Sequence, residues 1–203
     1  MERNYRQEYF YSSVLEATNK IERIGNFPID GVTFLNWFPI MKNPEALSSI
    51  LNALLYRIKE DIQTKPTIIL AVEARGFLLA PTIAHLLGTG LVVARRPNKL
   101  PGELIRIGQK TEYGEGALAI QKNAVTGKKV LIVDDVFATL GTIQCLNEVI
   151  EMDGGEVVGV AGLIDLLYCE KAFEPTYPLI SLYTLSNPDG KFTFQKDQAN
   201  ERI

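Results

Sequence analysis

Two adjacent aspartates, Asp134 and Asp135, follow a run of apolar residues and precede a loop of small and hydroxyl residues. The segment 130–142 reads VLIVDDVFATLGT, and a helix-like segment begins directly after it. Ionised carboxylates accept hydrogen bonds, so they suit the vicinal hydroxyls of a sugar and a hydrated magnesium ion. Backbone N–H groups at the start of a helix, with the helix dipole behind them, form a cradle for phosphate. The segment therefore predicts a site for a phosphorylated sugar.

A structural role competes with this interpretation for an isolated pair of aspartates, because acidic residues often end strands, and Asp135 could cap a turn. The complete unit of strand, two aspartates, loop and helix is more specific. It is neither a P-loop nor a Rossmann fingerprint, since it lacks both the glycine spacing and a Gly-Lys-Ser/Thr ending.

Basic residues follow two other apolar runs. Arg75 lies in the segment 72–81, VEARGFLLAP, while Arg95 and Lys99 lie in the segment 95–102, RRPNKLPG. Guanidinium and ammonium groups at neighbouring strand ends can bind the charged oxygens of pyrophosphate. Taken singly, each of these residues is more typical of an ordinary solvated charge.

Short apolar runs predict the strands that position these residues. The runs span residues 67–72, 91–94, 130–133 and 157–161. Between them, apolar residues at helical spacing predict helices that begin after Asn43 as N-cap and that span residues 78–87 and 142–152. This alternation predicts an α/β fold, with a mostly parallel sheet flanked by helices. Such sheets bind ligands at the carboxyl ends of their strands, where the charged residues lie.

Length and composition limit the partners of the chain. The 203 residues, 46% of them hydrophobic, predict a single domain over 1–203. A net charge of −3 gives no basic surface for nucleic acid or anionic lipid. The uncharged stretch 76–94 is interrupted by proline and glycine, so we expect no membrane span. Two cysteines and no secretory signal at the start predict reduced thiols and a cytoplasmic location.

The unit around the two aspartates resembles the signature with which type I phosphoribosyltransferases hold phosphoribosyl pyrophosphate (PRPP). The segments 72–81 and 95–102, together with Thr111-Glu112-Tyr113-Gly114, resemble the adenine phosphoribosyltransferase family. The resemblance covers roughly residues 24–186, with the motifs in the family's order. It implies the type I phosphoribosyltransferase fold, with a small hood and a flexible lid loop. The N-terminal extension and the C-terminal tail lie outside it.

The resemblance also implies an activity and its ligands. The family transfers the 5-phosphoribosyl group from PRPP to adenine, giving AMP and pyrophosphate in purine salvage. Mg²⁺ is expected to arrive with PRPP, with Asp134 and Asp135 in its outer coordination sphere, because the sequence shows no His/Cys/carboxylate cluster for a dedicated site. A homodimer is the family's usual assembly.

Each role falls on a residue that matches a family motif. The 5′-phosphate is expected to lie against Ala138, Thr139, Leu140, Gly141 and Thr142, with the ribose hydroxyls on the two aspartates and the pyrophosphate on Arg75, Arg95 and Lys99. Thr33 and Phe34 belong to the hood over the purine, and Glu112 is the catalytic residue that manages the purine N7 proton. A carboxylate can do this only where water is excluded, which the glycine-containing segment 99–116 would provide as a lid. A surface hairpin without that role is the alternative for this segment.

Two positions depart from the family pattern. Leu35-Asn36-Trp37 follows Phe34, where the family commonly has Arg-Asp, and Leu140 stands where the phosphate loop usually has glycine. The first predicts altered recognition of the base, and the second predicts a changed loop backbone or a crowded phosphate. Two alternatives therefore stay open: transfer to hypoxanthine, guanine or xanthine, and a regulator that binds PRPP without catalysis. Glu112, Arg75 and the loop with Lys99 argue against the regulator.

Overall fold

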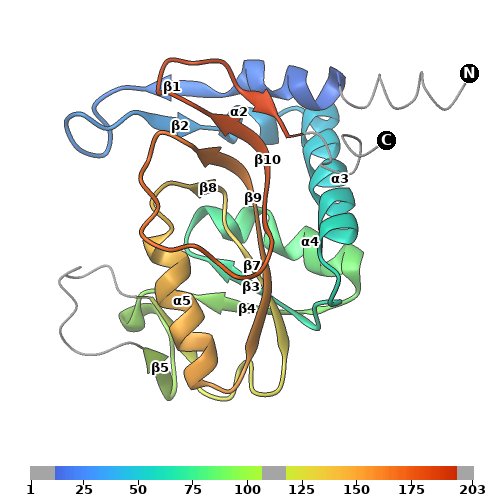
Figure 1. Cartoon of the computed structure of the whole chain (residues 1–203), viewed down its shortest axis with the longest axis vertical. Helices are drawn as coiled ribbons and strands as arrows, with labels where there is room; N and C mark the ends of the chain where they lie inside the picture. Colours follow the sequence, from blue (N-terminus) through green and yellow to red (C-terminus); the bar gives the residue numbers. More distant parts are fainter. Residues whose placement is uncertain (1–11, 107–117, 196–203) are drawn as a thin grey trace, which may run out of the picture.

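A sheet of seven strands forms the centre of the computed structural model, which describes residues 12–106 and 118–195 (Figure 1). The strand order is β11-β10-β9-β7-β3-β4, and β8 pairs with β9. All of these pairs are parallel except β10 with β11. The strands are β3 (Ile68–Val72), β4 (Gly90–Ala94), β7 (Lys129–Val133), β8 (Val136–Phe137), β9 (Glu156–Leu166), β10 (Leu179–Leu185) and β11 (Thr193–Phe194). The predicted mostly parallel sheet is confirmed.

Burial on both faces explains why β3 and β7 appear in the sequence as continuous apolar runs. All five residues of β3 are buried, and β7 is buried beyond Lys129. The fourth predicted strand is longer than its apolar run, because β9 continues to Leu166 through a further buried stretch. This extension carries the chain past the end of β7 and gives β8 its partner.

Helices cover the two faces of the sheet. The helices α3 (Pro44–Asp61) and α4 (Ala80–Leu87) pack on the face that carries Ile69 and Ala71. The helix α5 (Gly141–Met152) packs on the face that carries Leu70. Figure 1 shows the same arrangement, with α3 and α4 on one side and α5 on the other.

Local sequence explains where the helices begin and end. The predicted N-cap of α3 is confirmed, because the Asn43 side chain accepts a hydrogen bond from the Ala46 amide at 2.8 Å. The predicted glycine stop of α5 is confirmed as well, with Gly154 at φ +76°. The predicted helix 78–87 is preceded by a 3₁₀ turn, η2 (Arg75–Leu78).

A small antiparallel pair lies over one end of the main sheet (Figure 1). It consists of β1 (Glu22–Ile24) and β2 (Phe34–Asn36), preceded by η1 (Thr18–Lys20) and followed by α2 (Phe38–Met41). The predicted hood segment joins its two strands. We use the name hood for residues 22–37.

A second antiparallel pair is formed by a strand inside the predicted lid, residues 99–116, and a strand that follows it. The turn η3 (Pro97–Lys99) leads to β5 (Leu104–Arg106), which pairs with β6 (Ala119–Gln121). The rest of the lid, including Glu112, lies outside the described residues. In the described part of the chain, no helix has the length and apolar character needed to cross a membrane.

Candidate active site

The loop that follows β7 encloses a cavity of about 90 Å³ at the start of α5. The cavity is lined by Asp134, Val136, Phe137, Ala138, Thr139, Leu140, Gly141, Thr142 and Ile143. All five residues predicted to hold the 5′-phosphate are among them, and we call residues 138–142 the phosphate loop. Among the described residues, none accepts a hydrogen bond from the backbone N–H of Thr139 or Leu140. Unpaired amides at a helix start are the donors that an anion needs.

Leu140 keeps the backbone shape that glycine would adopt. Its φ of +65° lies in the left-handed region, which costs a residue other than glycine about 1–3 kcal/mol. The side chain is 4% exposed and packs in the apolar cluster between α5 and the sheet. Burial of this side chain offsets part of the free energy that the left-handed backbone costs. The expected weakening of phosphate binding by Leu140 stays a prediction.

Asp135 is a buried carboxylate that joins the sheet to the hood. It is 3% exposed, and its Oδ2 accepts a hydrogen bond from the Trp37 indole Nε1 at 2.7 Å. The same oxygen pairs with Arg75 Nε at 2.8 Å. Two charge-assisted contacts on one oxygen fix this side chain in place. It is not among the residues that line the 90 Å³ cavity, so its predicted contact with the ribose hydroxyls stays a prediction.

Asp134, in contrast, is half-buried and lines the cavity. Burial raises the pKa of its carboxyl well above the usual range, and the neighbouring Asp135 charge raises it further. The Asp135 amide, which donates to Asp134 Oδ1 at 2.9 Å, and the Arg75 charge oppose this rise in pKa. A carboxyl that keeps its proton more readily can donate a hydrogen bond as well as accept one.

Arg75 links Asp135 to the hood. Besides its pairing with Asp135, its Nη1 donates to the Leu35 carbonyl at 3.1 Å, and its guanidinium lies 4.6 Å from the centre of the Phe34 ring. Gly76 permits this position, because a Cβ there would lie 2.4 Å from the Val133 carbonyl oxygen. The assignment of Arg75 to pyrophosphate stays a prediction.

The other two predicted pyrophosphate ligands differ in their surroundings. Arg95 donates to Glu73 Oε1 through Nη2 at 2.7 Å and through Nε at 3.1 Å. The hydrogen bond from Arg95 lowers the pKa of Glu73, and the Arg96 amide, which donates to Oε2 at 2.9 Å, lowers it further against the effect of burial. Lys99 is exposed at the end of η3 and forms no ion pair with another described residue.

A larger cavity of about 540 Å³ lies beside η3 and β5. Its lining comprises Pro97, Asn98, Gly102, Leu104 and Arg106, all from the base of the predicted lid. Lys99 is not part of this lining, and Glu112 lies outside the described residues, so the assignments of both residues stay predictions.

The hood shows what replaces the family's Arg-Asp pair. Leu35 is 4% exposed and packs in the core, so its side chain takes part in folding, while its carbonyl contacts Arg75. Phe34 packs edge-on against Phe27 at 5.1 Å between ring centres, and Thr33 is half-buried. Their contact with a base stays a prediction.

Sequence reasoning missed three side chains around this site. Trp37 is fully buried and binds Asp135, while Lys171 and Asp165 form an ion pair beneath the phosphate loop at 2.6 Å. Trp37 and Asp135 are 98 positions apart, and no local pattern connects them. A lone lysine after a strand likewise carries no signal beyond its charge.

Known proteins with similar sequence and structure agree on one family. The phosphoribosyl transferase domain family matches residues 40–174 of this chain. Adenine phosphoribosyltransferase of Thermosipho melanesiensis is 42% identical over 156 residues, which cover 76% of this chain and 87% of that protein. The crystal structure of adenine phosphoribosyltransferase from Rhodothermus marinus has a TM-score of 0.78 and 31% identity, covering 86% of this chain and 99% of that one. The Saccharomyces cerevisiae adenine phosphoribosyltransferase was crystallised with an imino-altritol bisphosphate and adenine. Its structure has a TM-score of 0.75 and 31% identity to this chain, and the match covers 84% of this chain and 98% of that one.

Proposed function

Because the chain belongs to the adenine phosphoribosyltransferase family, we propose that it transfers the 5-phosphoribosyl group from PRPP to adenine, giving AMP and pyrophosphate. The observation that carries this proposal is the cavity lined by Asp134 and residues 138–142 at the start of α5. It offers a carboxyl for sugar hydroxyls and unpaired amides for a phosphate within one cavity.

The phosphate loop would bind the 5′-phosphate of PRPP. Amides of Thr139 and Leu140 are available as donors, and the Thr139 and Thr142 hydroxyls lie in the same lining. A fixed phosphate holds the ribose so that its anomeric carbon meets the base in a reproducible position. Asp134 would bind the ribose hydroxyls from the same cavity.

Departure of pyrophosphate leaves a ribosyl cation-like centre, so charge near both fragments controls the rate. Arg75, Arg95 and Lys99 would neutralise the departing pyrophosphate. Arg75 and Arg95 are held by Asp135 and Glu73, so little rearrangement is needed to orient them. Lys99 is exposed at the edge of the lid and would move with it.

The base would lie under the hood. Thr33 and Phe34 would contact the purine, and Glu112 would manage its N7 proton once the lid excludes water. Arg75, stacked on Phe34 and bonded to the Leu35 carbonyl, connects this part of the site with the aspartates.

Magnesium would accompany PRPP as the counter-ion of its pyrophosphate, neutralising charge on the departing group. The described residues contain no cluster of three or more His, Cys, Asp or Glu that could hold the ion alone. They fit an ion brought by the substrate, because Asp134 lines the cavity and offers an oxygen to the ion's hydration shell. Removal of Mg²⁺ with EDTA should abolish AMP formation while leaving the protein folded.

We also propose that the protein is a cytoplasmic homodimer, as the family resemblance implies. The two cysteines support a reducing compartment, because Cys145 and Cys169 are both free thiols. Sedimentation equilibrium distinguishes the dimer from a monomer of 22.6 kDa.

The departure at Leu35 keeps a second candidate open, namely transfer to hypoxanthine, guanine or xanthine. One assay separates the two. The protein is incubated with Mg²⁺, PRPP and each purine in turn, and nucleotides are separated by chromatography. AMP alone supports the proposal, and IMP, GMP or XMP supports the second candidate. Tight binding of PRPP without any product would instead identify a regulator and overturn both.

A further inference from the structure

The ammonium of Lys171 lies within hydrogen-bond distance of four oxygen atoms beneath the phosphate loop. Its Nζ lies 2.6 Å from Asp165 Oδ1, 2.6 Å from the Ala138 carbonyl, 3.1 Å from the Leu166 carbonyl and 3.3 Å from the Phe137 carbonyl. The side chain is 22% exposed, and its partner Asp165 is 11% exposed. A largely buried ammonium with this many partners is held in one position, and it holds those partners in turn.

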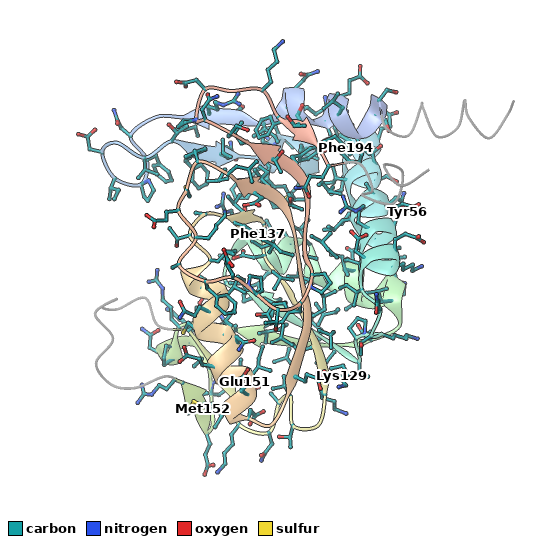
Figure 2. The ribbon with its side chains drawn as sticks, viewed as in Figure 1. Tyr56, Lys129, Phe137, Glu151, Met152 and Phe194 are labelled. Carbon is teal, nitrogen blue, oxygen red and sulfur yellow. The ribbon has the colours of Figure 1, made fainter. Side chains whose placement is uncertain are left out.

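The next residue extends this arrangement along the loop. The Ala172 amide donates to the Thr139 carbonyl at 2.8 Å. Three consecutive carbonyls, those of Phe137, Ala138 and Thr139, are therefore held by Lys171 and Ala172. Figure 2 places Phe137 in the middle of the molecule, between the hood and α5, while Lys129 and Glu151 lie at the far end.

Because the peptide group is planar, the contacts of these three carbonyls also determine where the N–H groups of the following residues point. In a trans peptide, each carbonyl points opposite to the N–H of the following residue. With three carbonyls turned toward Lys171 and Ala172, the amides of Ala138, Thr139 and Leu140 point to the other side of the loop. These three residues line the cavity, and the amides of Thr139 and Leu140 donate to no other described residue. The left-handed φ of Leu140 favours such a concave row of amides.

We infer that Lys171 is a positioning residue for the 5′-phosphate, acting on the phosphate loop from behind. It does not need to touch the substrate, because its ammonium fixes the peptide groups whose amides bind the phosphate. Asp165 compensates the charge of Lys171 and fixes its place at the end of β9. This inference rests on the proposed function, since it concerns the same PRPP site.

Calorimetric titration tests the inference with two separate ligands, ribose 5-phosphate and magnesium pyrophosphate. Lys171→Met removes the donors and keeps most of the side-chain volume. We expect its Kd for ribose 5-phosphate to rise about tenfold, which corresponds to about 1.4 kcal/mol. The Kd for magnesium pyrophosphate should change less than about twofold, because the hydrogen-bond partners of Lys171 among the described residues lie in β8, the phosphate loop and the end of β9. Lys128→Met, an exposed lysine that is removed from the loop, is the matched charge control.

A second variant covers the case in which Lys171→Met fails to fold. Asp165→Asn keeps the lysine and weakens only its anchor, so we expect a smaller rise, about threefold, confined to ribose 5-phosphate. Equal weakening for both ligands would assign Lys171 to general stability and overturn the inference, as would unchanged binding of ribose 5-phosphate to folded variants. Failure of the unmodified protein to bind ribose 5-phosphate would overturn the proposed function itself.

Discussion

The phosphate loop and the hood both depend on the region around Asp135, but they are built in different ways. The loop follows β7, a buried strand between β3 and β9, and its carbonyls are held by Lys171 and Ala172. The hood is an antiparallel pair whose strand β1 is exposed at every residue. Side chains such as Trp37 and Arg75 connect it to the end of the sheet.

This difference in construction matches the two proposed tasks, binding of the phosphate by the loop and recognition of the base by the hood. A phosphate is the same in every PRPP molecule, and the loop proposed to bind it follows directly on strands of the main sheet. The hood is attached to the sheet through individual side chains such as Trp37 and Arg75, so its exposed residues can change while the sheet stays intact. We expect substitutions in the hood to alter base recognition before they alter phosphate binding.

The largest effect should come from the residue shared by both regions. Asp135→Ala leaves the Arg75 guanidinium and the Trp37 indole without their acceptor, so we expect the free energy of unfolding to fall by about 3 kcal/mol. Urea denaturation measures the loss. Asp135→Asn, which keeps an acceptor oxygen but loses the charge, should lose less, and equal losses in the two variants would show that the charge alone carries the effect.

Glu112→Ala should affect the chemistry at the base without affecting the binding of PRPP. We expect kcat to fall about 100-fold, while KM for PRPP changes little, because only proton management at the base is lost. Steady-state AMP formation measures both constants. Glu115→Ala, in the same segment of the sequence, is the control. Unchanged turnover in Glu112→Ala would remove this residue from its assigned role.

Trp37→Phe should show how much the hood depends on one hydrogen bond. The variant keeps an aromatic ring and loses the N–H that donates to Asp135. A hydrogen bond to a charged group contributes about 1.5–3 kcal/mol to stability. We expect unfolding to become easier by about 1.5 kcal/mol and KM for adenine to rise more than KM for PRPP. Phe38→Leu, at the half-exposed neighbouring position, is the control, and equal behaviour of both variants would contradict the assignment.

Asp134→Asn should have an effect on stability that depends on pH, because the variant side chain cannot ionise. The pKa of Asp134 is raised in the folded protein, so the folded state binds the proton more tightly than the unfolded state. The stability of the unmodified protein should therefore decline as pH rises above about 3.9, the ordinary aspartate pKa, through the raised value.

The asparagine variant lacks this decline. It should be more stable than the unmodified protein at neutral pH, and the difference should vanish below the ordinary pKa. Urea denaturation at several pH values measures the gap between the two proteins. A gap that is independent of pH would show that ionisation of Asp134 costs no stability.

The sequence allowed prediction of those parts of the structure that are determined by residues close together in the chain. A buried run marks β7 at Lys129–Val133, and one amide contact makes Asn43 the cap of α3. The phosphate loop was predictable for the same reason, since its strand, aspartates and helix are contiguous. The hydrogen bond from Trp37 to Asp135 was not, because it exists only after strands far apart in the sequence have been brought together. Nor could residue type alone show that Lys171 faces three backbone carbonyls and one carboxylate.

The burial of Trp37 also gives the protein an internal optical reporter. The chain has one tryptophan, so its tryptophan fluorescence arises from a single indole at the junction of hood and sheet. Emission from that indole responds to the charge and hydration of the carboxylate it contacts. We expect PRPP binding at the carboxyl end of the sheet to change this emission, which stopped-flow spectroscopy would follow without any label.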